Sequence, residues 1–168
     1  MASYVFDQVK TWVVTGKLDF KNGSKTCYYK IALLSDPDIV NNWTKWSKKK
    51  LWSDIPDGYE VSISPDTNYK RKQLYNVGNE NTKDFSSDKL FDTLVYADDI
   101  SYIASTMSVS CVLIVRSLYA GDNIIPGDEL VVAIDIRKSG SSISTNDGVF
   151  TVKLSKASDG SGGFLIIK

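Results

Sequence analysis

The sequence predicts a mainly β protein, an antiparallel β-sandwich or barrel with one or two short helices near the N-terminus. Short runs of β-branched, aromatic and aliphatic residues recur at fairly even spacing, and Asn-Gly, Pro-Asp-Gly and Pro-Gly turn signals separate them. Apolar residues at helical spacing occur mainly in the first fifty positions. This order of elements is typical of sandwiches and barrels.

Length and composition favour one domain that spans residues 1–168, with a polar insertion loop around 65–90. The chain has 168 residues, of which 42% are hydrophobic and 24% charged, as in ordinary globular domains. Twenty basic residues balance twenty acidic ones, so no global field attracts nucleic acid or an anionic membrane. Without a membrane-length apolar run or a signal-peptide pattern, we expect an intracellular, soluble protein.

The N-terminal third is expected to contain both helices. Apolar residues from Val5 to Val13 recur at helical spacing, Ser3 can cap them and Gly16 can end them, which predicts a helix over residues 4–15. A short strand over 18–20 and an Asn-Gly turn over 21–25 follow. Residues 26–34 are apolar on both alternating faces and predict a central strand. Asp36-Pro37 then predicts a short helix that ends before the lysine run.

The rest of the chain predicts strands joined by turns. After a turn at Ile55–Gly58, residues 59–64 alternate as a strand does. The following residues, 64–88, are polar and are expected to form a long loop that contacts a neighbour. Further strands are expected over 91–96, 100–103, 108–118, 130–136, 148–154 and 164–167, with antiparallel pairing of 108–118 and 130–136, a polar loop over 139–147 and a hairpin turn over 159–163.

No catalytic, cofactor or metal site is expected, and an enzyme is the least favoured class. Histidine is absent, which removes the commonest general base and zinc ligand. Cys27 and Cys111 lie in apolar runs and predict buried free thiols. Asp98 and Asp99 could be metal ligands or a shared-proton pair, but neighbouring strand residues point to opposite faces. A turn with solvated carboxylates is favoured.

Three of the four tryptophans cluster with a lysine run between residues 43 and 52. Stacking and phosphate neutralisation would suit nucleic acid. The favoured alternative places the tryptophans in the core and the lysines at a solvated helix end. A third alternative uses exposed tryptophans as anchors of a protein interface. The residues assigned to that hypothetical interface are Trp43, Trp46, Lys48, Lys49, Lys50, Trp52, Tyr69 and Tyr75.

The order of several short motifs resembles a family of small virion-associated structural proteins of tailed bacteriophages. The motifs are GKLDF (16–20), KIALL (30–34), LWSDIP (51–56), ADDI (97–100), VLIV (112–115), VVAIDI (131–136) and FLIIK (164–168). The chain departs from the family pattern in its 66–89 insertion, its tryptophan and lysine cluster, and a serine-rich loop in place of a Pro-Asn-Gly turn. Its richness in Lys, Asn, Tyr and Ser also resembles proteins of crAss-like phages.

The resemblance implies a non-enzymatic auxiliary or decoration protein of the virion, assembled in the host bacterial cytoplasm. Its partners would be other virion proteins, above all the major capsid protein, with many copies in one assembly and no cofactor. A neck, tail or head-fibre attachment component of the same virion is the alternative. A nucleic-acid-binding module is less favoured.

Overall fold

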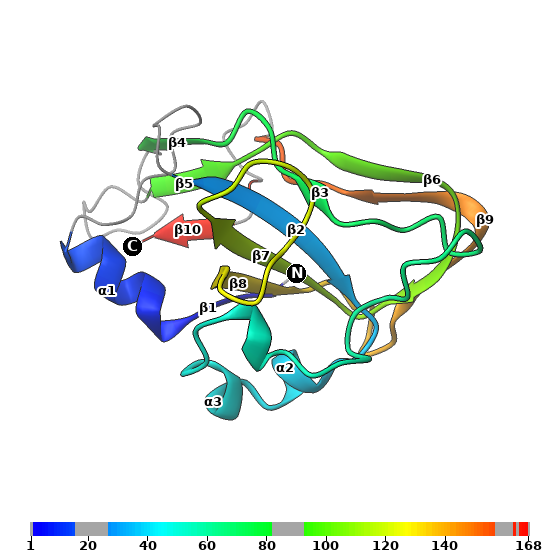
Figure 1. Ribbon diagram of the computed structural model, residues 1–168, viewed down its shortest axis with the longest axis horizontal. Coiled ribbons are helices and arrows are strands. Elements are labelled where there is room, and N and C mark those ends of the chain that lie inside the picture. The colour runs from blue at the N-terminus through cyan, green and yellow to red at the C-terminus, as the bar shows by residue number, and fades with distance from the viewer. Residues whose placement is uncertain (1, 16–26, 82–92, 157–162, 164, 168) are drawn as a thin grey trace.

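Strands are the commonest regular structure in the computed structural model, which describes residues 2–15, 27–81, 93–156, 163 and 165–167. The protein is mainly antiparallel β with few short helices near the N-terminus, as the sequence predicts (Figure 1). The strands are β1 (Ala2–Val5), β2 (Tyr28–Leu34), β3 (Lys72–Gln73), β4 (Gly78–Asn81), β5 (Thr93–Tyr96), β6 (Ile100–Val109), β7 (Cys111–Ser117), β8 (Glu129–Asp135), β9 (Ile143–Val152) and β10 (Leu165–Ile167). The helices are α1 (Asp7–Thr15), α2 (Asp38–Asn41), α3 (Trp43–Trp46) and the 3₁₀ turn η1 (Trp52–Asp54).

The largest sheet has the order β1-β8-β7-β2-β3, and all its pairs are antiparallel. Its inner strands are buried on both faces, because β7 is fully buried from Cys111 to Val115 and β2 from Tyr29 to Leu34. Two-sided burial explains why these strands read as continuous apolar runs. The predicted pairing of 108–118 with 130–136 is confirmed, with Cys111 opposite Asp135 at one end and Arg116 opposite Glu129 at the other.

The remaining strands form a second layer, which makes the arrangement sandwich-like. β10, β5 and β4 form one small sheet, and β6 and β9 form a two-stranded ribbon. Tyr102 of β6 lies 5.6 Å from Tyr69 and 6.5 Å from Phe150, measured between ring centroids. All three aromatic residues belong to one continuous core with the inner strands of the main sheet. Cys27 and Cys111 are buried thiols that form no disulfide among the described residues, as predicted.

The N-terminus differs from the predicted helix over 4–15. Residues 2–5 form β1, in which Tyr4 pairs with Ala133 and Val5 with Val132, and the helix begins only at Asp7. The edge of β8 offers backbone partners to this segment, and Phe6 enters the core with no exposed surface. Tertiary pairing therefore overrides the helical spacing of the first residues.

The predicted strand over 59–64 does not form. Glu60 makes one isolated bridge to Leu34, and no further ladder continues from it in the described residues. The next donor on the edge of β2, the Leu33 amide, bonds the Tyr69 hydroxyl at 3.0 Å. A side chain thus occupies a position that a paired strand would need.

Two predicted loops contain strand structure. The polar excursion after Ser64 includes β3 and β4, and the predicted loop over 139–147 contains the first half of β9 from Ile143 onward. The polar residues of that half pair with β6 while their side chains face solvent. The predicted strand over 18–20, the turns over 21–25 and 159–163, and the 82–90 part of the insertion loop lie outside the described residues, except Gly163.

Candidate protein-binding site

Trp46 is a core residue and not an interface residue. Its side chain is 2% exposed, its ring lies 5.8 Å from that of Tyr59, and its indole nitrogen donates a 2.9 Å hydrogen bond to the Asp38 carboxylate. A side chain with almost no exposed surface adds no contact area for a partner. The structure therefore corrects the interface prediction for Trp46 and supports the alternative in which it anchors α3 to the core.

Trp43 and Trp52 are half-buried. The Trp43 ring lies 5.3 Å from Tyr4 and 4.9 Å from Phe6, so it fixes α3 against the N-terminal segment. The Trp52 ring is covered by the guanidinium group of Arg71 at 5.0 Å. Both rings keep some exposed surface, but their main contacts lie within the chain.

The lysine run lies at the surface between α3 and η1. Lys48 and Lys50 are exposed, and Lys49 is half-buried with its amine 3.7 Å from Asp54. Asp54 also accepts hydrogen bonds from the amides of Lys50 and Leu51, at 3.0 and 3.1 Å. These bonds lower the pKa of Asp54. The run is thus partly neutralised by a carboxylate that also shapes its backbone.

The two tyrosines of the predicted interface have opposite environments. Tyr69 is 2% exposed, and its hydroxyl donates to Glu60 at 2.7 Å. Burial, with the Glu60 charge, raises the pKa of Tyr69. Tyr75 is 56% exposed and remains a surface residue. The interface prediction is therefore corrected for Tyr69.

Asp38 holds the two short helices together through its carboxylate. It accepts hydrogen bonds from Asn42, from Trp46, from the Tyr59 hydroxyl at 3.0 Å and from the Lys45 amine at 3.3 Å. These bonds, led by those from Asn42 and Trp46, lower the pKa of Asp38 from 3.8 to about 2. Charged hydrogen bonds of this kind favour the ionised carboxylate.

Acid titration provides a test of this role. Because the folded-state pKa of Asp38 is depressed, its contribution to stability is complete above about pH 4 and is lost as pH falls through about 2. We expect Asp38→Asn to flatten the fall in the free energy of unfolding between pH 4 and 2. Urea unfolding followed by tryptophan fluorescence measures this, with Asp57→Asn in an exposed turn as the control; equal slopes for wild type and Asp38→Asn would contradict the prediction.

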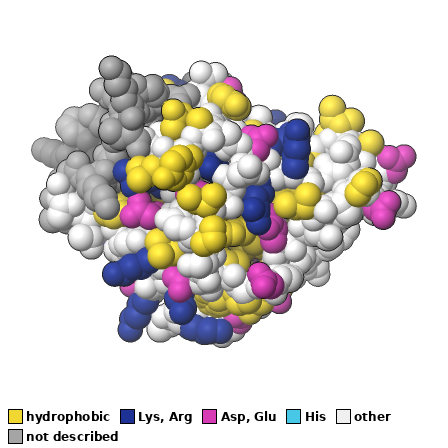
Figure 2. Space-filling view, in the orientation of Figure 1, with side chains coloured by type: hydrophobic (Ala, Val, Ile, Leu, Met, Phe, Trp, Pro, Cys, Tyr) yellow, Lys and Arg dark blue, Asp and Glu magenta, His cyan; other side chains and the backbone are white. Residues whose placement is uncertain are grey.

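The exposed apolar surface that the sequence did not reveal lies on the loop between β7 and β8. Leu118 is 64% exposed, Tyr119 62%, Ile125 39%, and Leu51, which precedes η1, 38%. These four side chains, called here the β7–β8 patch, line a shallow groove of about 490 Å³. Hydrophobic side chains gather over this loop on the face shown in Figure 2. Clustered exposed apolar residues mark interaction surfaces more often than isolated ones do.

A buried ion pair fixes this loop to the main sheet. The Lys30 amine of β2 lies 3.7 Å from the Asp128 carboxylate, and the two side chains are 1% and 2% exposed. Lys30 also donates to the carbonyl oxygen of Asn123, and Asp128 accepts from the amide of Ile125 at 3.1 Å. Both charges are therefore paired and hydrogen-bonded, as buried charges need to be.

Further hydrogen bonds tie the same loop to its neighbours. The Gln73 backbone amide donates a 2.8 Å hydrogen bond to the Asp122 carboxylate. The Gln73 side-chain oxygen accepts a 2.6 Å hydrogen bond from the Gly121 backbone amide. Arg71 donates to the carbonyl of Ile124 at 3.2 Å, and the Trp52 amide donates to that of Asp128 at 2.7 Å. The patch thus sits on a loop whose backbone is held along much of its length.

An ion pair between Arg116 and Glu129, which are opposite each other across β7 and β8, also lines the groove. The Arg116 guanidinium group also lies 5.4 Å from the Trp12 ring. The groove is therefore lined both by exposed apolar side chains and by two charged side chains that are already paired within the chain.

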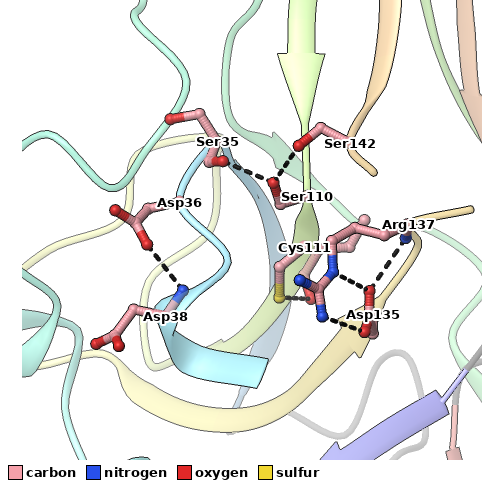
Figure 3. A network of polar contacts seen from close by, with 9 residues as sticks. Ser35, Asp36, Asp38, Ser110, Cys111, Asp135, Arg137 and Ser142 are labelled. Atoms are coloured by element: carbon pink, nitrogen blue, oxygen red, sulfur yellow. Dashed lines mark hydrogen bonds and ion pairs between the residues drawn. The ribbon is translucent and has the colours of Figure 1, made fainter. Parts of the chain in front are cut away.

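The opposite end of the same strands is polar (Figure 3). Ser110 donates to the Ser35 carbonyl at 2.7 Å and shares a 2.6 Å hydrogen bond with Ser142. The Arg137 guanidinium group donates two hydrogen bonds to Asp135, at 2.9 and 2.8 Å, and the Arg137 backbone amide donates a third at 3.1 Å; these bonds lower the pKa of that carboxyl. These polar groups therefore satisfy one another's hydrogen bonds at this end of the sheet.

Asp98 and Asp99 have separate partners, as expected of a turn. Asp98 accepts from the Asn76 side chain at 2.8 Å, and Asp99 accepts from the amides of Leu154 and Ser155, both at 2.8 Å. The two carboxylates are therefore structural acceptors at the corner between β5 and β6. Within the described ranges, no group of three or more Cys, Asp or Glu residues could hold a metal ion.

None of the helices described by the structure is both long and apolar enough to cross a membrane. Comparisons of the chain with protein-family models, with curated proteins and with solved structures give no match.

Proposed function

We propose that this chain is a non-enzymatic structural protein of a phage virion, an auxiliary or decoration protein that docks on the capsid through the β7–β8 patch. The observation that carries the proposal is a set of four large apolar side chains, 38–64% exposed, of which three lie on a loop anchored by a buried ion pair and the fourth, Leu51, precedes η1 beside it. Docking would cover this surface and stabilise the shell by added contact area.

The anchoring of the loop favours binding. Association is weakened when loops and side chains must be ordered on contact, and a loop that is already held avoids most of that cost. Tyr119 adds a large amphipathic ring, a residue type enriched at binding hot spots. The patch is also bordered by charged groups, in keeping with an apolar centre and a polar rim.

The virion assignment rests on the resemblance in motif order. The KIALL, VLIV and VVAIDI motifs form the buried inner strands β2, β7 and β8, so they act as scaffold. The LWSDIP motif contributes Leu51 to the patch and turns through η1 beneath it. Scaffold and patch therefore both include segments that resemble the phage family. The major capsid protein is the partner that this proposal favours.

Binding to particles that lack this protein tests the proposal. We expect Leu118→Asp with Tyr119→Ser to raise the dissociation constant for the particle at least tenfold, because burying a charge in an apolar contact costs about 1.4 kcal/mol or more of binding free energy. The matched control is Ile63→Asp, which alters an isoleucine that is 57% exposed and does not line the groove. Circular dichroism checks that all variants fold.

Two results would count against the proposal. Wild-type binding by the double variant would exclude the patch as the docking surface. A copy number of about a dozen or fewer per particle would favour the neck, tail or head-fibre alternative, because a decoration protein repeats with the capsid lattice.

A further inference from the structure

Strand β9 has an edge without a strand partner among the described residues. β9 has ten residues and, of the strands that the structure describes, pairs only with β6; the two run side by side as a ribbon (Figure 1). Backbone N–H and C=O groups along a free edge form a template for another strand. The partner that suits this edge is therefore an extended polypeptide segment, whose backbone can pair with these groups.

The edge also lacks the residues that usually prevent such pairing. Proteins commonly protect edge strands with lysine, proline or inward charges. Between Ile143 and Val152 there is no lysine or proline, and Asp147 is the only charged residue. A positive φ of 48° at Asp147 interrupts the regular strand there and leaves residues 148–152 as its regular part.

The side chains around this regular part are complementary to those of the same segment in a second copy of the chain. Asp147, Val149, Thr151 and Lys153 are exposed, whereas Phe150 and Val152 are buried. If two copies align antiparallel with Phe150 opposite Phe150, Val149 of one copy faces Thr151 of the other. Just beyond the two ends of this paired segment, the same alignment brings Asp147 of each copy toward Lys153 of the other. Within the described residues, neither Asp147 nor Lys153 forms an ion pair inside its own chain.

We propose that β9 is a homodimerisation edge, on which a second copy adds its own β9 to form a four-stranded sheet β6-β9-β9-β6. β-Branched and opposite-charge pairs placed directly across antiparallel strands are stabilising. The twofold axis closes the contact, so that pairing stops at the dimer. Because the formal net charge is zero, no long-range electrostatic repulsion opposes the association of two copies. This edge is distinct from the β7–β8 patch, and either proposal can fail without the other.

Sedimentation equilibrium of the full chain, combined with cysteine cross-linking, tests the register. We expect a species of twice the chain mass, and a covalent dimer when chains carrying Val149→Cys are mixed with chains carrying Thr151→Cys under mild oxidation. Directly opposite residues have Cα atoms about 4.5–5.5 Å apart, within the range that a disulfide spans. Each variant alone should give little covalent dimer, because its cysteines are not opposite each other.

Charge exchange gives an independent readout. Lys153→Glu should raise the dimer dissociation constant about tenfold, because it sets two pairs of like charges face to face. Adding Asp147→Lys should restore the dimer, whereas Lys48→Glu, in the surface lysine run, should leave it unchanged. The proposal would be overturned if the chain stayed a monomer at all concentrations. It would also be overturned if either cysteine variant alone cross-linked as much as the mixture, or if the double charge exchange failed to restore the dimer.

Discussion

Asp128→Asn should lower the free energy of unfolding by about 3–5 kcal/mol, because it leaves the Lys30 ammonium group buried without its countercharge. The Lys30 side chain is 1% exposed, and among the described residues its amine has the Asn123 carbonyl oxygen as a further partner. An isolated charge in such an environment has a high desolvation cost. The β7–β8 loop should loosen with it, since Asp128 also holds the Ile125 amide.

Urea unfolding gives the measurement, and a double variant gives the control. Lys30→Met with Asp128→Leu removes both charges and should regain most of the lost stability, since a buried ion pair adds little over apolar residues of similar volume. Lys10→Met, which breaks an exposed ion pair with Asp7, should cost less than about 1 kcal/mol. If Asp128→Asn matched Lys10→Met, the loop would not depend on the buried pair.

Trp46→Ala should lower the free energy of unfolding by about 3–5 kcal/mol, the range for large aromatic residues removed from a core. The substitution also removes the indole donor to Asp38, which keeps its remaining bonds to Asn42, Tyr59 and Lys45. Both effects act on the packing of α2 and α3 against the sheet.

The matched comparison is Tyr119→Ala on the patch. Its ring is 62% exposed, so its loss should change stability by less than about 0.5 kcal/mol. Thermal and urea unfolding of both variants separate core from surface aromatic residues. Equal effects would contradict the division between Trp46 as scaffold and Tyr119 as binding residue.

The sequence predicts the parts of this fold that depend on long apolar runs. The inner strands β2, β7 and β8 were predictable because burial on both faces demands apolar residues at every position. The edge elements were less predictable, because their partners are distant. Residues 2–5 become a strand through β8, and residues 59–64 fail to become one because the Tyr69 hydroxyl takes a backbone donor of β2.

The candidate site was harder to predict than the fold. The hypothetical interface includes Trp46 and Tyr69 because of their residue types, although hydrogen bonds to Asp38 and Glu60 allow both to be buried. The β7–β8 patch had one signal, two apolar pairs, Leu118-Tyr119 and Ile124-Ile125, within a connection otherwise rich in turn residues.

That signal alone does not fix which apolar residues are exposed. Ile124 is 5% exposed and its neighbour Ile125 39%. The difference depends on the contacts that fix the loop backbone, among them those of the Lys30 amine with Asn123 and Asp128. In the sequence, Lys30 is only one polar residue within an apolar strand, and nothing in the sequence indicates these contacts.

Site-specific photo-cross-linking in the assembled particle tests the central claim most directly. A photoreactive residue at position 119, in the patch, should give a covalent product with another virion protein, the major capsid protein under the present proposal. The same residue at position 63, which is also exposed but away from the groove, should give little product. Cross-linking from position 63 with none from position 119 would contradict the assignment of the β7–β8 patch as the docking surface.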